Sequence, residues 1–154
     1  KIEGGLNFLA FTEQHASGHK EISIIFVCVY ELEGRKGQLH ALKLGQLDEP
    51  VHKKNNEDGN EKSDPLTPIW KHSANGELKN KPAAFTFPDT DAHRVIIASY
   101  SGSITYLDAV TGKVLDEKHD LGAIHADPVT ILEEETEDPT MTTIVCSCTW
   151  KGQV

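Results

Sequence analysis

Two residue pairs in the chain have types and spacings that could support redox or metal chemistry. The first is Cys146 and Cys148, which one residue separates. On a strand at this spacing the two thiols point to one face, ~6.6 Å apart, near the upper end of the distances that a disulfide allows. Structural zinc usually needs two to four residues between the cysteines and two further ligands. We therefore interpret Cys146 and Cys148 as buried free thiols.

The second pair is His15 and His19, which have the i, i+4 spacing of two metal ligands on a helix. The residues between them read Ala-Ser-Gly, which favours an exposed hairpin loop instead. His93, His119 and His125 are expected near strand ends. They could line a shared surface there, although histidines at such positions are usually incidental. The sequence thus gives no metal-ligating set.

Sequence motifs for catalysis are missing. The chain contains no Gly-x-Ser-x-Gly elbow, no Gly-x-Lys-Ser/Thr phosphate loop and no Gly-x-Gly-x-x-Gly fingerprint. We assign no catalytic, cofactor-binding or metal-binding residue from the sequence, and we favour a protein that is not an enzyme, with an enzyme as the alternative.

The charge of the chain argues against two classes of partner. Its 24 acidic and 15 basic residues give a net charge of −9. Nucleic acids and anionic membrane surfaces attract basic proteins, so we expect neither. Residues 48–64 hold six acids and three lysines, residues 133–138 hold five acids, and the rest is nearly neutral. We interpret both segments as solvated insertions; an acidic docking surface is the alternative.

Features that report on the cell compartment favour the cytoplasm weakly. The three cysteines do not form a disulfide framework, and no Asn-x-Ser/Thr sequon occurs. No secretory signal opens the chain, and no apolar run approaches the ~20 residues of a membrane span. The chain begins with Lys1 rather than Met, so we interpret it as a segment of a longer protein. The lumen of the endoplasmic reticulum is therefore the alternative location.

A repeated pattern is the strongest architectural signal. When Trp70 is aligned with Asp116, a glycine follows six residues later in both copies, a branched aliphatic residue eight later and a proline twelve later. A second correspondence places an aromatic residue two positions before a glycine, as in 95–102 and 145–152. Without the polar insertions the period approaches about 40–45 residues, which is typical of a four-stranded propeller blade. The aligned pairs are Gly76 and Gly122, Leu78 and Ile124, and Pro82 and Pro128.

The local composition favours strands throughout. Residues 22–30 and 143–150 are rich in β-branched and aromatic side chains, and several runs in the chain are apolar on both faces. This is typical of a sheet that lies between two other layers. Asp108 and Gly112 are expected to form a turn, the first by accepting backbone hydrogen bonds and the second by adopting a positive φ. Because no segment of ten residues has a helical period, the sequence predicts an all-β fold.

Residues 102–115, GSITYLDAVTGKVL, resemble the repeat of quinoprotein-type (PQQ-like) β-propellers. Blades of that family carry the pattern Gly-x-aliphatic-x-Ala/Tyr-Leu-Asp-Ala-x-Thr-Gly-Lys-aliphatic-aliphatic-Trp. Asp116 replaces the closing tryptophan here, but the preceding unit has it as Trp70. That unit also keeps the segment GQLHAL at 37–42, whereas an insertion replaces its turn. The matching residues are Gly102, Ile104, Leu107, Asp108, Ala109, Thr111, Gly112 and Lys113.

The resemblance implies β-propeller blades, each a four-stranded antiparallel sheet, in an incomplete ring of about three. The first blade would span 1–80 with a long polar insertion at 46–68, the second 81–119, and a partial third 120–154. Propellers have about four to eight blades, so we interpret the chain as a segment of one longer propeller. Several copies completing one ring is the alternative. A WD40-type propeller is the alternative family, because Leu107-Asp108 stands roughly where its Trp-Asp pair would.

For function, the resemblance implies a non-catalytic module that acts as a protein-interaction scaffold or as a ligand-recognition or sensor domain. In that family such modules can be appended to larger enzymes, including acyl-activating synthetases. The alternatives are part of a PQQ-dependent dehydrogenase and a WD40-like interaction hub. Family members that bind PQQ hold it with calcium, carboxylates, an arginine and a tryptophan. No motif places these ligands here, where the only arginines are Arg35 and Arg94, so we expect no cofactor. The expected partners are another protein or the remaining blades.

Overall fold

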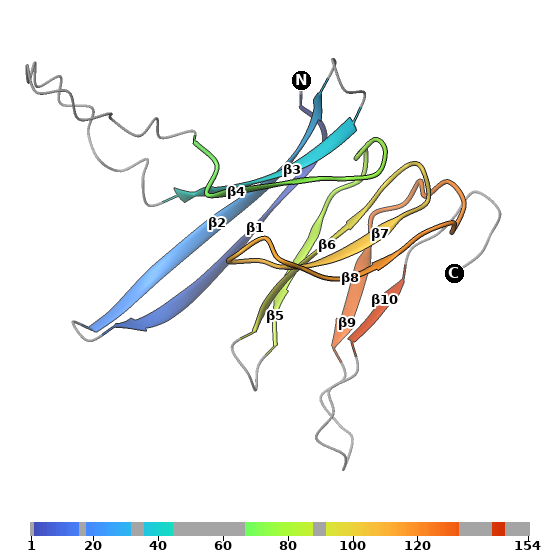
Figure 1. Ribbon diagram of the computed structural model, residues 1–154. Coiled ribbons are helices and arrows are strands. Elements are labelled where there is room, and N and C mark those ends of the chain that lie inside the picture. Colours follow the sequence, from blue (N-terminus) through green and yellow to red (C-terminus); the bar gives the residue numbers. More distant parts are fainter. Residues whose placement is uncertain are drawn as a thin grey trace, which may run out of the picture.

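The structure is a computed structural model that describes residues 2–15, 18–31, 36–44, 67–87, 92–132 and 143–146 (Figure 1). These residues form ten β-strands and no α-helix. The strands are β1 (Ile2–His15), β2 (Gly18–Glu31), β3 (Lys36–Lys43), β4 (Trp70–Ser73), β5 (Ala83–Thr86), β6 (His93–Ala98), β7 (Ile104–Asp108), β8 (Val114–Lys118), β9 (Val129–Leu132) and β10 (Thr143–Cys146).

The strands form two four-stranded sheets and a hairpin. Sheet 1 has the order β1-β2-β3-β4, and sheet 2 has the order β5-β6-β7-β8. Neighbouring strands are antiparallel in both, so each sheet is a meander in which the chain passes from one strand to the next beside it. Strands β9 and β10 pair antiparallel beyond sheet 2 (Figure 1). The prediction of an all-β fold with four-stranded antiparallel sheets is confirmed.

The described strands follow the chain in three groups. Sheet 1 uses residues between 2 and 73, sheet 2 uses residues between 83 and 118, and the hairpin uses residues between 129 and 146. Residues 46–66 of the predicted insertion and the acidic segment 133–138 lie outside the described residues.

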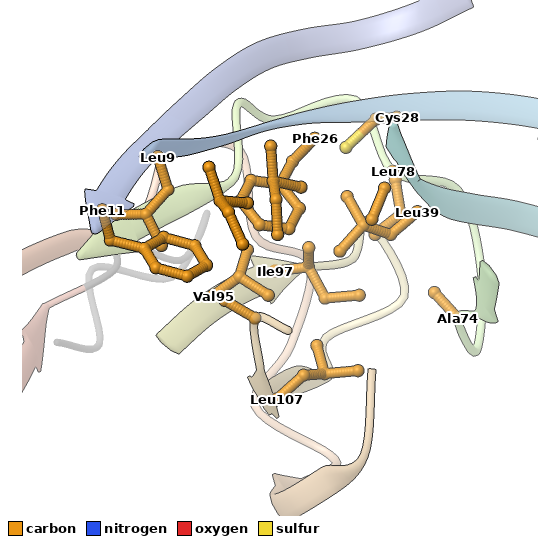
Figure 2. Close-up of a cluster of buried hydrophobic side chains, with 14 residues drawn as sticks. Leu9, Phe11, Phe26, Cys28, Leu39, Ala74, Leu78, Val95, Ile97 and Leu107 are labelled. Carbon is orange, nitrogen blue, oxygen red and sulfur yellow. The ribbon is translucent and has the colours of Figure 1, made fainter. Parts of the chain in front are cut away.

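The hydrophobic core lies between the two sheets. Side chains alternate between the faces of a strand, so every second residue of β2 points toward sheet 2. Phe26 and Leu39 from sheet 1 and Val95 and Leu107 from sheet 2 are fully buried in this layer. Figure 2 shows the labelled side chains of both sheets meeting there. Members of the same cluster are Leu9, Phe11, Ile22, Ile24, Cys28, Ala41, Ala74, Leu78, Ile97 and Ala109.

The two sheets differ in how their faces are covered. In β6, four consecutive residues, 95–98, are at most 2% exposed, so both faces of sheet 2 are covered there. Sheet 1 is covered on the face toward sheet 2 alone, among the described residues. On its other face Leu6 is 58% and Phe8 is 62% exposed. We call this the outer face of sheet 1; it is formed by Leu6, Phe8, Ile25, Val27, Val29 and Leu42, which the strand register places on one side.

Trp70 and Asp116 occupy corresponding places in their sheets. Trp70 pairs across the ladder with Ala41, four residues after Gly37, and Asp116 pairs with Tyr106, four residues after Gly102. The aligned glycines, Gly76 and Gly122, both have positive φ, at 111° and 77°. The aligned aliphatic residues, Leu78 and Ile124, are both buried. The geometry thus agrees with the alignment of the two segments.

Candidate functional site: the connector end

The chemistry-bearing residues singled out in the sequence are scattered over the structure. Cys148 lies outside the described residues, and Cys146 ends β10 without a described side chain, so their state as free thiols stays a prediction. Cys28 is free and buried; burial chiefly, and Asp127 in addition, raise the pKa of its thiol to about 12. A thiol with that pKa is not a nucleophile at neutral pH.

His15 and His19 lie on the two arms of a hairpin. Strand β1 ends at His15 and β2 begins at Gly18, so that His15 pairs with Gly18 and Gln14 with His19. The i, i+4 spacing therefore does not place them on a helix face; the segment is a hairpin, but both histidines lie on its paired strands rather than in its loop.

The other three histidines do not line a shared surface. His93 begins β6, where its ring stacks on Phe11 at 3.7 Å between centroids and its Nδ1 lies 2.9 Å from the Thr86 hydroxyl. His125 contacts Tyr100, which follows the other end of β6. His119 follows β8, 3.6 Å from Glu117. His93 therefore lies at one end of the strands of sheet 2, and His119 and His125 lie at the other end. The three histidines do not share one surface.

One end of the sheets carries the described polar and aromatic groups that are best placed for recognition. We call it the connector end, because residues 74–82 and 119–128 cross it on the way from β4 to β5 and from β8 to β9. Two hydrogen bonds tie these connectors side by side. The Asn80 amide donates to the Ile124 carbonyl at 3.1 Å, and the Lys81 N–H donates to the Asp127 carboxylate at 2.7 Å.

Tyr100 lies where the two connectors meet. The residue is 41% exposed, and its backbone N–H donates to the Glu77 carbonyl at 2.8 Å. The Lys79 ammonium lies 4.7 Å from the ring centroid, and the His125 ring approaches at 4.6 Å and 88°. The carboxylate of Glu77 pairs with Lys79 at 2.8 Å. We call Glu77, Lys79, Tyr100 and His125 the Tyr100 cluster.

Three serines beside Tyr100 make a structural network. The Ser99 hydroxyl lies 2.9 Å from that of Ser101 and 2.7 Å from that of Ser103, and it accepts the Ser103 N–H at 3.1 Å. The Ser101 hydroxyl donates to the Asn75 carbonyl. Hydroxyl nucleophiles need an adjacent base, and no base contacts these described hydroxyls. The network therefore holds the turn in place.

Arg94 is engaged in a structural ion pair. Its Nη1 donates to the Asp108 carboxylate at 3.0 Å and to the His93 carbonyl at 2.9 Å. Burial would raise the pKa of Asp108, but hydrogen bonds from Thr111 and Val110, with the Arg94 charge, hold that pKa below its usual value. Arg35 lies outside the described residues.

Two groups lie at the seam between the outermost strands of the sheets. The Trp70 indole N–H donates to the Ala109 carbonyl at 3.1 Å, and its ring covers Gly112. On the same face of β4, the Nε2 atom of His72 is buried without a hydrogen-bond partner. Burial lowers the pKa of His72, and the carboxylate of Glu117 opposes that effect in part.

Neither a group of metal ligands nor a membrane-crossing helix occurs among the described residues. Within the described ranges, no three His, Cys, Asp or Glu side chains are grouped so that they could hold a metal ion. The same ranges contain no helix with the length and apolar character needed to cross a membrane. No protein-family model, curated protein or solved structure matches the chain.

Sequence reasoning missed the Tyr100 cluster. One signal for it was present, because Tyr100 stands two residues before Gly102 as Trp150 stands two before Gly152. That pattern marks a repeated aromatic position, but only the pairing of the connectors brings Lys79 and His125 to the ring.

Proposed function

We propose that this chain is a segment of a quinoprotein-like β-propeller that serves as a non-catalytic module for protein interaction or ligand recognition. The observation that carries the proposal is the seam at Trp70. Trp70, which aligns with the closing tryptophan of the repeat, packs its ring against Gly112 and donates its indole N–H to the Ala109 carbonyl. Both partners belong to the Asp-Ala-x-Thr-Gly turn of the next sheet. A contact between two parts of one repeat pattern favours a regular stack of sheets.

The outer face of sheet 1 gives independent support. An apolar sheet face needs a second layer, and large exposed apolar patches mark interaction sites. Leu6 and Phe8 are exposed there, whereas β6 of sheet 2 is covered on both faces. A further blade stacked on sheet 1 would give it the coverage that sheet 2 already has.

The non-catalytic part of the proposal rests on the chemistry of the described groups. The buried thiol of Cys28 has a pKa of about 12, and the hydroxyls of Ser99, Ser101 and Ser103 bond to one another and to backbone. Arg94 is held by Asp108. The connector end, in contrast, offers an exposed aromatic ring and charged side chains, which suit recognition.

Thiol accessibility in the full-length protein tests the stacked architecture. With Cys146 and Cys148 replaced by serine, Phe8→Cys reports on the outer face of sheet 1, and Leu115→Cys, at a position 41% exposed on β8, is the matched control. We expect Phe8→Cys to react with a maleimide at least about ten-fold more slowly than Leu115→Cys in the native state. Equal rates would mean that the outer face is open, and the stacked architecture would be wrong.

A second experiment tests the absence of quinone chemistry. The full-length protein is incubated with PQQ and calcium, freed of unbound quinone by gel filtration, and examined for quinone absorbance. We expect none to remain with the protein. If one equivalent of quinone stayed bound, the proposal of a non-catalytic module would be wrong and a PQQ-dependent dehydrogenase would be favoured.

A further inference from the structure

The dipeptide Asn75-Gly76 lies near the start of the connector 74–82, and its sequence is the one most prone to deamidation. In this reaction the backbone nitrogen of the following residue attacks Cγ, the side-chain carbonyl carbon of asparagine. Glycine hinders the attack least, because it carries no side chain beside its nitrogen. Asn75 is exposed, so water can reach it. Sequence and exposure together mark Asn75 as a candidate modification site.

Deamidation at Asn75 needs no reagent other than water. The Gly76 nitrogen loses its proton and bonds to Asn75 Cγ, the side-chain amide leaves as ammonia, and a five-membered succinimide ring forms. Water then opens the ring at one of its two carbonyl carbons. Cleavage of the new Cγ–N bond gives aspartate, whereas cleavage of the original peptide bond gives isoaspartate, in which the backbone runs through Cβ and Cγ.

The fold holds Asn75 in a conformation from which the succinimide cannot close. The Gly76 N–H donates to the Ala74 carbonyl at 3.1 Å, which is the hydrogen bond of a γ-turn centred on Asn75. Asp120 is the one described residue other than glycine with a positive φ, so this turn is of the inverse type, with ψ of about +65° at its centre. At that ψ the Gly76 nitrogen and the Asn75 Cβ lie on opposite sides of the Cα–C bond. Ring closure needs them on the same side, so Asn75 must first rotate about this bond.

Hydrogen bonds on both sides of the dipeptide resist that rotation. The Asn75 carbonyl accepts the Ser101 hydroxyl, from the turn between β6 and β7. The Gly76 carbonyl accepts the N–H of Gly37 in β3 at 2.8 Å, and the Gly37 carbonyl accepts the Ala74 N–H at 2.9 Å. The start of the connector is thus tied to both sheets. These ties must open locally before the nitrogen can attack.

We propose that Asn75 is a latent deamidation site, which the native fold keeps unreactive and which converts to isoaspartate when the start of the connector opens. The change is lasting, because isoaspartate adds one atom to the backbone. With that extra atom the carbonyls of residues 75 and 76 no longer both reach Ser101 and Gly37. The modification therefore loosens the attachment of the connector to the two sheets. The inference is independent of the proposed recognition function.

Deamidation rates of the folded and the unfolded full-length protein test this protection. The protein is incubated near neutral pH, either native or in guanidinium chloride, and is then digested briefly with trypsin. Mass spectrometry follows the peptide 72–79, in which Asn75 is the sole asparagine. We expect the native protein to react at least about ten-fold more slowly, because the reaction waits for local opening. A native rate closer than this to the unfolded rate, or no reaction in the unfolded protein, would overturn the inference.

Ser101→Ala removes one of the ties and leaves the dipeptide itself intact. We expect its native rate to rise about two- to five-fold, with an unchanged rate in guanidinium chloride. Ser73→Ala is the matched control, because it removes an exposed hydroxyl two residues before Asn75 without removing a tie. Circular dichroism confirms that both variants are folded. If the two variants deamidated at equal rates in the native state, the Ser101 contact would not restrain Asn75.

A comparison with Asn75→Asp separates the altered backbone from the added charge. This variant carries the new carboxylate on an ordinary backbone, so both carbonyl ties can form. Unfolded protein that has deamidated is refolded, and its isoaspartate form is isolated by chromatography. We expect the isoaspartate form to unfold at a temperature about 2–8 °C below that of Asn75→Asp. Equal unfolding temperatures would mean that the longer backbone does not loosen the connector, and the lasting effect would be wrong.

Discussion

The indole N–H of Trp70 in sheet 1 donates a 3.1 Å hydrogen bond to the carbonyl of Ala109, in the turn that follows β7 of sheet 2. The same ring packs over Gly112 and lies 5.8 Å from Phe26, centroid to centroid. One side chain therefore joins the outer strand of sheet 1, the core and a turn of sheet 2. This contact is directional, whereas the aliphatic layer between the sheets is not.

Trp70→Phe should lower the stability of the chain while keeping an aromatic ring at the seam. The substitution leaves the Ala109 carbonyl without the indole donor, and we expect a loss of about 1–2 kcal/mol in the free energy of unfolding. Trp70→Ala also removes the ring and should cost about 3 kcal/mol. Urea unfolding followed by circular dichroism measures both. The neighbouring exposed Ile69→Ala is the control, and a Trp70→Phe variant as stable as the unmodified protein would contradict the role of the hydrogen bond.

Gly112→Ala should be destabilising for two separable reasons. Gly112 has a φ of 72°, which disfavours any side chain, and a Cβ there would lie 2.6 Å from the Trp70 ring. We expect a cost of about 1–3 kcal/mol in the free energy of unfolding. In the Trp70→Ala background the steric part disappears and only the φ part remains, so the cost should fall. A double-mutant cycle measures this difference. Additive effects would mean that the ring and the turn are not in contact.

Asp108→Ala should destabilise the turn between β7 and β8. The carboxylate accepts the Thr111 N–H at 2.9 Å and the Val110 N–H at 3.1 Å, and it pairs with Arg94. Removing it leaves those donors without their acceptor and takes the counter-charge from Arg94, which keeps its hydrogen bond to the His93 carbonyl, at a cost of about 1–3 kcal/mol. Asp116→Ala is the matched control, because that carboxylate is exposed on β8 and should hardly contribute. Equal stability of the two variants would contradict the role of Asp108.

Local features of the fold could be predicted from the sequence because short-range chemistry decides them. Asp108 and Gly112 form the expected turn, since a carboxylate two to three residues before its donors and a residue free of Cβ are local requirements. This turn needs no knowledge of distant segments. The all-β class followed from the strand-forming composition, whereas the four-stranded sheets were expected from the propeller period and resemblance.

Contacts between distant segments could not be predicted in the same way. Trp70 was recognised as a repeat position, but its partner lies 39 residues away and belongs to the other sheet. His93 and His119 lie next to strand ends as expected, whereas His125 lies within the connector from β8 to β9, and the direction of β6 separates His93 from it. The Tyr100 cluster depends on two connectors lying side by side, which spacing alone does not specify.

The free energy of unfolding should decrease as the pH is lowered, because His72 becomes protonated in the unfolded chain before it does in the native state. Burial lowers the pKa of His72, and Glu117 opposes this only in part, so the native state favours the neutral ring. The unfolded chain binds a proton near the ordinary pKa of about 6.5, and the native state binds it only at lower pH. Between those two values the unfolded state holds more protons, so the free energy of unfolding decreases as pH falls.

The variant His72→Gln isolates this effect from other titrating groups. We expect the unmodified protein to lose more stability than His72→Gln when urea unfolding is compared at pH 7.5 and pH 5.5. Glu117→Gln, which removes the opposing charge and keeps a partner for the Thr105 hydroxyl, should enlarge the loss. If Glu117→Gln reduced this loss of stability instead, the Glu117 carboxylate would not be favouring the protonated His72 ring. The proposed electrostatic interaction between β4 and β8 would then be wrong.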